Sequence, residues 1–315
     1  MAAQKISERR KILDNSIAVI IPCHNEEATV GKVIADFRAS LPEAVIYVLD
    51  NASTDRTAEA ARNAGATLIF ESRKGKGFAV QTLFERIDAD YYVIVDGDDT
   101  YPADESPALL REAVEGGFDM VVGARLDRYS GHAFRPLHHL GNRFIRFTIN
   151  KLFHVALSDI LSGYRVLSRN FVKGVPLLAV GFEIETELTL KALYYGYKIK
   201  EIDIHYRERP QGSYSKLRTF TDGFRVLSLI VMIVRDYRPF FFFSLIGTVL
   251  LLFGLIFGGV VIKEYIETRY IRRVPLAVLS ASTVIAALLN YFAGLILDSL
   301  SRRFKEIMIV GKKRL

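Results

Sequence analysis

Three carboxylates follow an apolar run within four positions. In VIVDGDDTYP, residues 93–102, the acids are Asp96, Asp98 and Asp99. Like charges this close repel one another unless a cation lies between them. Gly97 gives the backbone the freedom to direct Asp96 and Asp98 into one space, and their hard oxygens suit Mg²⁺ or Mn²⁺. The spacing therefore predicts a divalent metal held by Asp96 and Asp98.

The acid cluster also has two competing interpretations. An EF-hand loop needs a bidentate Glu at its twelfth position, which counted from Asp96 is Pro107, so an EF-hand is excluded. A solvated Asp-Gly turn is ordinary turn chemistry and stays open on these residues alone.

The elements that would position the acids alternate along the chain. Strands are expected at residues 17–21, 45–49, 67–70 and 91–95, with helices at 26–39, at 54–64 and after Gly77. This alternation predicts an α/β fold with a mainly parallel sheet and helices on both faces. Ligands bind at the carboxyl ends of the strands in such sheets. Polar clusters lie at three of these ends, at residues 22–27, 50–55 and 96–99.

The second half of the chain contains two long uncharged segments. Residues 240–262 and 274–297 are each long enough to cross a bilayer, and only eleven residues join them. This predicts an integral membrane hairpin with both ends on one side. The distribution of Lys and Arg favours the cytoplasm for that side, and the absence of an apolar signal-peptide stretch near the N-terminus agrees. A single cysteine, Cys23, fits a reducing compartment.

An amphipathic segment precedes the first apolar one. Apolar residues step by three and four through residues 215–238, at Leu217, Phe220, Phe224, Leu227, Val231 and Val234. We expect a helix lying in the membrane interface, although a domain helix packed on the sheet stays open. The net charge of +7 suits anionic lipid headgroups or phosphorylated ligands. Nucleic acid is a weaker interpretation of this charge, because the sequence has no basic patch interspersed with aromatic residues.

Taken in order, the motifs resemble a known family. VIIPCHNEEATV, VLDNASTDRT, RKGKGFAV, VDGDDTYP and GAR have the order and spacing of family 2 glycosyltransferases of the GT-A fold, the Rossmann-like fold of nucleotide-diphospho-sugar transferases. LSDILSGYRVLSR, GFEIETEL and YRERPQGSYSKLRTF, followed by two apolar segments, resemble the polyprenyl-phosphate glycosyltransferases, the dolichol-phosphate-mannose-synthase-like group. The resemblance covers about residues 15–300.

The resemblance implies a layout of five parts. A charged N-terminal segment, residues 1–15, precedes a cytoplasmic GT-A catalytic domain at 16–214. The amphipathic juxtamembrane helix at 215–238, the hairpin at 239–298 and a basic cytoplasmic tail at 299–315 follow. Small residues, Gly247, Gly254, Gly258 and Gly259, would let apolar helices pack closely, either within one hairpin or in a homo-oligomer.

The resemblance also implies a donor site. Its nucleotide-binding residues would be Pro22, His24, Asn25, Glu26, Asp50, Asn51, Lys76, Asp96 and Gly97. The backbone of a helix beginning near Glu26 would add hydrogen-bond donors. Asp96 and Asp98 match the D-x-D pair that holds Mg²⁺ or Mn²⁺ on the pyrophosphate. The family pattern can carry a metal-contacting Gln two places further on, where this chain has Thr100, so a third protein ligand stays open.

An acceptor site is implied as well. Arg125 and Arg209 match the family best and join Asp96 and Asp98 as the expected catalytic residues. The acceptor phosphate would be bound by Arg125, Arg135, Arg165, Arg209, Ser215 and Lys216. Asn142, Asp159, Ser162 and Gly163 would shape the acceptor loop. Glu183 and Glu185 begin a helix, where capping or fold support is an equal interpretation.

These expectations define one reaction and leave three rival functions. A lipid phosphate, with a second pKa of about 6, already carries an anionic oxygen that attacks the sugar of a UDP- or GDP-linked donor, so no catalytic base is needed. The resemblance implies that the transfer inverts the anomeric carbon. The first rival, a processive polysaccharide synthase, would carry Q-x-x-R-W, yet this chain has no Trp. The second rival is transfer to another lipid, such as diacylglycerol, and the third is a non-catalytic membrane module.

Overall fold

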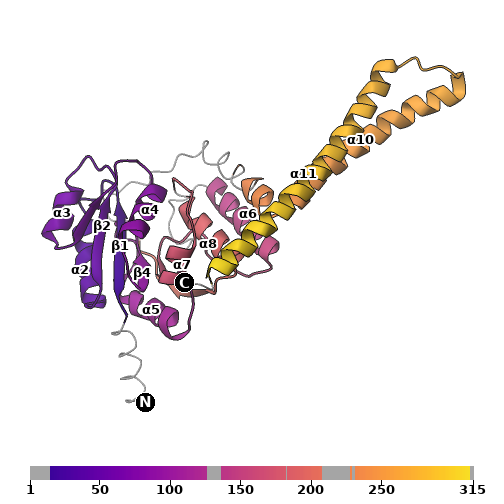
Figure 1. Ribbon diagram of the computed structural model, residues 1–315. Helices are drawn as coiled ribbons and strands as arrows, with labels where there is room; N and C mark the ends of the chain where they lie inside the picture. Colours follow the sequence, from indigo (N-terminus) through magenta and orange to yellow (C-terminus); the bar gives the residue numbers. More distant parts are fainter. Residues whose placement is uncertain (1–14, 126–135, 182, 208–227, 229–230, 313–315) are drawn as a thin grey trace. The chain divides into compact units, whose positions relative to one another are not determined.

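The computed structural model describes residues 15–125, 136–181, 183–207, 228 and 231–312 (Figure 1). The chain divides into two compact units, with the boundary at Asp222–Gly223. The first holds a β-sheet with its helices, and the second holds two long helices. Each unit is described by itself.

Within the described residues, seven strands form one sheet in the order β3-β2-β1-β4-β6-β5-β7. The strands are β1 (Ile17–Cys23), β2 (Val45–Asp50), β3 (Thr67–Phe70), β4 (Tyr91–Ile94), β5 (Met120–Arg125), β6 (Arg165–Ser168) and β7 (Ile199–Ile204). Neighbours pair in parallel except β6, which is antiparallel to both β4 and β5. The predicted, mainly parallel sheet is confirmed.

Helices cover both faces of this sheet. They are α2 (Val30–Ser40), α3 (Thr57–Asn63), α4 (Lys76–Arg86), α5 (Ser106–Glu115), α6 (Pro136–Phe153), α7 (Arg169–Gly174) and α8 (Ile184–Tyr194), with a 3₁₀ turn η1 (Ala103–Glu105). Alternate residues of β1 enter different cores. Val19 and Ile21 pack with Phe37 of α2, while Ile20 packs with Leu83 of α4. The two-residue period of a strand thus explains why β1 is apolar throughout.

Two helices begin later than the sequence predicts. The expected starts are Glu26 and Thr54, whereas α2 begins at Val30 and α3 at Thr57. The backbone N–H groups of residues 25–27 donate instead to side chains of residues 53–57, so both segments form interlocked turns before their helices start.

The second unit contains α10 (Pro239–Thr268) and α11 (Val274–Lys312). Both are long and apolar enough to cross a membrane, with mean hydropathies of 2.7 and 1.8. They contain the predicted segments 240–262 and 274–297, and α11 continues into the expected basic tail. Their insertion in a bilayer stays a prediction.

Direct contacts join α10 to α11. The Ser280 hydroxyl donates to the carbonyl of Gly254 at 2.8 Å, and the hydroxyls of Thr248 and Tyr291 are 2.7 Å apart. Gly247, Gly254 and Gly258 lie against α11, whereas nothing lies within 4 Å of the position that a Cβ on Gly259 would take. Three of the four predicted small residues therefore pack within one chain, so they no longer argue for association between copies.

Most of the predicted interface helix lies outside the described residues. Of residues 215–238, the structure describes Ser228 and Val231–Tyr237, which are helical, and Arg238, which is not.

Candidate active site

The acid turn, residues 96–100, follows β4 and lies against the end of β1. A Cβ on Gly97 would be 2.6 Å from the Cys23 sulfur, so only glycine fits this approach. The Thr29 hydroxyl donates to the Gly97 carbonyl at 2.6 Å. Asp98 is 4% exposed, and its Oδ1 accepts from the Thr100 hydroxyl at 2.6 Å. Thr100 is fully buried, so it orients Asp98 rather than supplying the third metal ligand that the sequence left open.

Acids from three strand ends converge around Cys23. Burial raises the pKa of this thiol well above its ordinary value, and the nearby carboxylates of Glu26, Asp96, Asp50 and Asp98 raise it further. Cys23 at the end of β1 pairs with Asp50 at the end of β2, and its sulfur lies against Gly97 of the acid turn after β4, so the polar ends of these three strands lie together as expected.

Lys76 is the cation that faces the acid turn from α4. Its Nζ lies 2.5 Å from Oδ1 of Asp96 and 2.5 Å from Oε1 of Glu185, in the first turn of α8. Burial alone would lower the pKa of Lys76, but these two carboxylates more than offset burial and hold that pKa well above its ordinary value. Glu185 therefore does more than support a helix end, whereas Glu183 does accept from the backbone N–H groups of Val180 and Gly181.

Asn51 builds the loop that carries Lys76. Its Nδ2 donates to the carbonyls of Glu71 and Arg73 at 3.2 and 2.7 Å, and its Oδ1 accepts from the N–H of Gly75 at 2.8 Å. Because the whole amide is used in this way and the residue is 5% exposed, the side chain of Asn51 shapes the loop, and a contact between Asn51 and the nucleotide stays a prediction.

The end of β1 also differs from the expectation. Oδ1 of Asn25 accepts from Thr54 N at 2.7 Å, and the N–H of Glu26 donates to the Thr57 hydroxyl at 2.8 Å. The backbone donors expected at a helix start near Glu26 are therefore already satisfied, and that expectation is wrong. Among the predicted nucleotide-binding side chains at this edge, Nδ1 of His24 lies 2.8 Å from the Asn51 carbonyl, and Oδ1 of Asp50 accepts from the N–H of Ser53 at 3.1 Å. The contacts of His24, Glu26 and Asp50 with a nucleotide stay predictions. Pro22 lies within β1.

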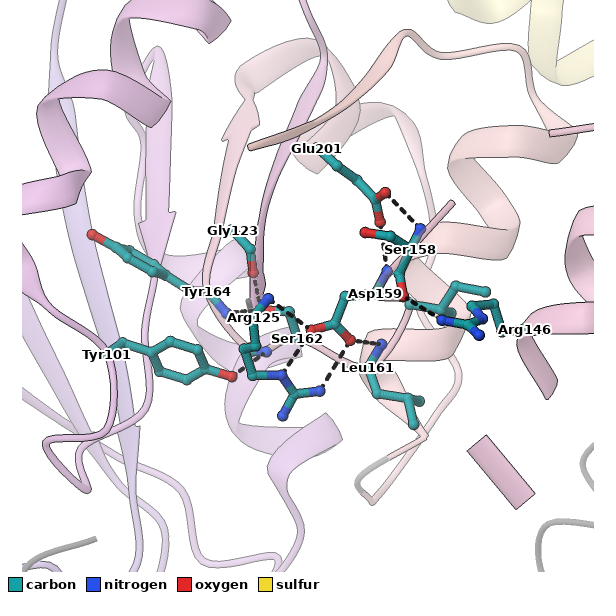
Figure 2. A network of polar contacts seen from close by, with 12 residues as sticks. Tyr101, Gly123, Arg125, Arg146, Ser158, Asp159, Leu161, Ser162, Tyr164 and Glu201 are labelled. Carbon is teal, nitrogen blue, oxygen red and sulfur yellow. Dashed lines mark hydrogen bonds and ion pairs between the residues drawn. The ribbon is translucent and has the colours of Figure 1, made fainter. Parts of the chain in front are cut away.

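Arg125, at the end of β5, is held by Asp159 in a two-pronged ion pair (Figure 2). The guanidinium Nε and Nη2 donate to the carboxylate at 2.7 and 3.0 Å. Burial would lower the pKa of Arg125, but Tyr101 and Asp159 more than offset it. The side chain keeps 24% exposure against 4% for Asp159, so Arg125 is the member of the pair that still reaches solvent.

The segment 158–164 around Asp159 is fixed at several points (Figure 2). Glu201 accepts from the N–H groups of Ser158 and Asp159 at 2.6 and 2.8 Å. The Ser162 hydroxyl donates to the Gly123 carbonyl at 2.6 Å. This confirms that Asp159 and Ser162 shape a loop. The backbone of Asn142 lies in α6.

Gly163 connects this loop to the acid turn. Its N–H donates to the Tyr101 hydroxyl at 3.0 Å. A Cβ at this position would lie 2.7 Å from Oδ2 of Asp96 and 3.1 Å from Nζ of Lys76. The absence of a side chain at residue 163 therefore lets the loop of Asp159 touch the proposed metal ligand.

The predicted phosphate-binding role of Arg165 is wrong. The residue is 1% exposed, and its guanidinium donates to the carbonyls of Ser162 and Ile160 and to the Thr189 hydroxyl at 2.9, 2.7 and 2.8 Å. Burial lowers the pKa of Arg165 from its ordinary value. The remaining predicted acceptor residues, Arg135, Arg209, Ser215 and Lys216, lie outside the described residues and stay predictions.

Sequence reasoning missed three residues of the site. Tyr101 lies two positions after Asp99, and its hydroxyl accepts from the N–H of Gly163. The residue that packs against its ring, Tyr164 with 5.4 Å between ring centroids, is remote in sequence. Lys32 of α2 lies 2.8 Å from Asp99, and Glu201 binds the loop from β7. Nothing local in the sequence marks these distant partners.

The donor set fits a divalent metal that shares its coordination with a substrate. Among the described residues no group of three or more His, Cys, Asp or Glu side chains is arranged to hold a metal. Asp96 and Asp98 would thus supply few protein ligands, and Mg²⁺ characteristically takes one or two carboxylates and completes its shell with phosphates and water.

Comparisons with solved structures agree with this fold. Glucosyl-3-phosphoglycerate synthase of Mycobacterium tuberculosis, in complex with Mn²⁺, UDP-glucose and phosphoglyceric acid, superposes with a TM-score of 0.59 at 21% identity. The match covers 73% of this chain and 82% of that one. The first unit therefore has the GT-A fold.

Comparisons of sequence extend further along the chain. Glycosyltransferase AglJ of Haloferax volcanii is 31% identical over 295 residues, 93% of this chain and 96% of the relative. The dolichyl-phosphate hexose transferase of the same organism is 29% identical over 71% of this chain and 96% of its own length. The family model described as Glycosyl transferase family 2 matches residues 18–175. The chain is a glycosyltransferase that belongs to glycosyl transferase family 2.

Proposed function

We propose that this glycosyltransferase moves a sugar from a nucleotide-diphosphate sugar to a polyprenyl phosphate, with inversion at the anomeric carbon. The observation that carries the proposal is that the chain joins a site of paired acids and fixed cations, Asp96, Asp98, Lys76 and Arg125, to two apolar helices of membrane-spanning length. The similarity to a dolichyl-phosphate hexose transferase over most of that relative's length supports the same acceptor class.

The donor binds at the ends of β1, β2 and β4. Asp96 and Asp98 would hold Mg²⁺ or Mn²⁺, and the ion would supply positive charge to stabilise the negative charge that develops on the departing nucleotide diphosphate. His24, Glu26 and Asp50 offer side-chain polar groups to the base and ribose. Thr100 holds Asp98 in place, and Gly97 keeps the turn close to β1.

The acceptor phosphate binds to the exposed part of Arg125, together with Arg135, Arg209, Ser215 and Lys216. The Asp159 ion pair fixes the guanidinium plane before the acceptor arrives, which reduces the entropy lost on binding. The phosphate is the nucleophile and already carries a negative oxygen at neutral pH, so the site needs no general base. We place the first unit in the cytoplasm and the hairpin α10–α11 in the membrane.

The test uses the full chain in lipid nanodiscs. UDP- and GDP-linked sugars are offered with polyprenyl phosphate or diacylglycerol, in Mn²⁺ or in a chelator, and the glycolipid product is measured by mass spectrometry. We expect product with polyprenyl phosphate in Mn²⁺ alone. Equal transfer to diacylglycerol, or full transfer in chelator, would refute the acceptor or the metal respectively.

A matched pair of variants locates the chemistry. Asp96→Asn removes one carboxylate of the proposed metal pair, and we expect transfer to fall by at least about a hundredfold, the range seen when one group that stabilises transition-state charge is lost. Asp203→Asn makes the same change at an exposed position of β7 and serves as the control. Equal activity in both variants would contradict the role of Asp96.

A further inference from the structure

Lys76 and a metal ion require the same carboxylate. Oδ1 of Asp96 lies 2.5 Å from the ammonium of Lys76, and Oδ2 lies 2.7 Å from where a Cβ on Gly163 would be. Oδ1 of Asp96 is therefore already paired, and Oδ2 faces the backbone of Gly163 across a space too small for a methyl group. A divalent cation that binds Asp96 would come close to the ammonium of Lys76, and two positive charges a few ångströms apart repel strongly.

The main chain around Lys76 leaves little freedom to withdraw. Gly75 has a φ of 144°, a backbone conformation that is strained for any residue with a side chain. The N–H of Gly77 donates to the Val180 carbonyl at 3.1 Å. A Cβ on Gly77 would lie 2.0 Å from the Ala179 carbonyl oxygen. The Cα of Lys76 is thus fixed between two anchored glycines. Its ammonium changes partner only by rotation of its own side chain.

Glu185 is placed to take that ammonium. It lies 2.5 Å from Nζ of Lys76, and its side chain is 7% exposed against 27% for Asp96. The ion triad therefore has an inner carboxylate, Glu185, and an outer one, Asp96, which faces the side from which a solvated cation would come.

We propose that Lys76 competes with the divalent cation for Asp96, and that Glu185 is the positioning residue that retains Lys76 when the cation binds. This inference rests on the proposed function, because it assumes that Asp96 is a metal ligand. In this arrangement the ammonium of Lys76 balances the charge of the acid turn when no metal is bound. Glu185 keeps Lys76 paired when the metal displaces it from Asp96, which lowers the free-energy cost because a buried ammonium without a partner is strongly destabilising.

The test measures Mn²⁺ binding directly, from the electron paramagnetic resonance signal of free Mn²⁺ during titration of the full chain in nanodiscs. Lys76→Met should bind Mn²⁺ at least about fivefold more tightly, the lower end of ordinary coupling between sites. Glu185→Gln should bind it at least about fivefold more weakly, because Lys76 then has Asp96 as its remaining carboxylate partner in the triad. Lys200→Met, on β7 beside Glu112, makes the same charge change elsewhere and should leave the affinity unchanged.

The double variant separates partner exchange from simple electrostatics. If charge alone matters, Glu185→Gln weakens Mn²⁺ binding equally with and without Lys76, and the proposal is wrong. If Lys76 exchanges partners, Glu185→Gln has no weakening effect in the Lys76→Met background. Circular dichroism checks that each variant folds, and Lys76→Gln replaces Lys76→Met if the latter does not.

The failure of the proposed metal site is distinguishable from the failure of this inference. Asp96→Asn should abolish Mn²⁺ binding if the metal site is right. Unchanged Mn²⁺ affinity in Asp96→Asn would refute the metal assignment itself. Loss of affinity in Asp96→Asn together with unchanged affinity in Lys76→Met would refute only the competition.

Discussion

Gly163→Ala adds one methyl group where the acceptor loop touches Asp96. The new Cβ would be 2.7 Å from Oδ2 of Asp96 and 3.1 Å from Nζ of Lys76, so the carboxylate oxygen must move by about 0.7 Å to reach the 3.4 Å of an ordinary contact. Gly163 is not among the glycines of positive φ, so alanine fits the backbone itself. The atoms that must move are the ends of flexible side chains, and we expect a stability cost of about 1 kcal/mol at most.

The cost to catalysis should be larger than the cost to stability. A misplacement of about 1 Å can cost about a hundredfold in rate, so a shift of this size in a metal ligand predicts a loss of about ten- to a hundredfold in kcat/KM. That loss corresponds to about 1.4 to 2.7 kcal/mol of transition-state stabilisation.

The assay compares Gly163→Ala with Gly31→Ala. Gly31 lies in α2 with nothing within 4 Å of its would-be Cβ, so alanine there should keep full activity and raise stability by up to about 1 kcal/mol. Thermal midpoints and glycolipid formation are measured for both variants. Wild-type kcat/KM in Gly163→Ala would show that the position of Asp96 does not limit the reaction, and the proposed role of this carboxylate would fail.

Four further outcomes are expected. Gly97→Ala should lower stability by about 1–3 kcal/mol, because its Cβ would lie 2.6 Å from the sulfur of Cys23, and adding Cys23→Ala should restore the thermal midpoint; no restoration would contradict the contact. Arg165→Met should destabilise the fold by about 1–3 kcal/mol, because buried carbonyls lose their donor, while leaving the KM for the lipid acceptor unchanged in the folded fraction. A selective rise in that KM would revive its phosphate-binding role. Burial, with a smaller contribution from a nearby carboxylate, raises the pKa of Tyr197 to about 12. The contribution of Tyr197 to stability is therefore present below about pH 10 and lost as the pH rises to about 12. The thermal midpoint of Tyr197→Phe should fall less steeply at alkaline pH, and an unchanged fall would contradict the shift. Gly254→Leu should separate α10 from α11, because even a Cβ there would lie 2.6 Å from the nearest α11 side chain, and unchanged cross-linking between cysteines engineered into the two helices would argue against the hairpin packing.

Four of the seven described strands, β1 to β4, were predicted because their signals are local, whereas β5, β6 and β7 were not predicted. The bounds of β3, Thr67–Phe70, match the expected strand, and β1, β2 and β4 differ from expectation by at most two residues at either end. Each of these four strands is a short, mainly apolar run followed by polar residues, and both features can be read within one segment. By contrast, β7 has the sequence IKEIDI and β6 begins with the buried Arg165. The starts of α2 and α3 were misplaced because side chains some thirty positions away, such as Thr57 beneath Glu26, satisfy the backbone before the helix begins.

The candidate site was harder to predict because side-chain roles depend on distant partners. Arg125 and Arg165 are the same residue type, and both match the family pattern. Their difference lies in what surrounds them: Asp159 orients Arg125 at the end of β5, whereas Ile160 and Ser162 enclose Arg165 within the sheet. No property of either arginine's own neighbours in sequence distinguishes the two.

The surroundings of a side chain also decide whether its substitution changes stability or activity. Asn51, Thr100 and Arg165 bond to the chain itself, so their loss should act first on stability and only through it on activity. Asp96 and Arg125 are each paired yet keep about a quarter of their side chains exposed, 27% and 24%. A paired and partly exposed charge can exchange its protein partner for a ligand at little cost, whereas a fully enclosed one cannot. Exposure combined with pairing therefore separates Asp96 and Arg125 from Asn51, Thr100 and Arg165, whereas the other proposed metal ligand, Asp98, is 4% exposed.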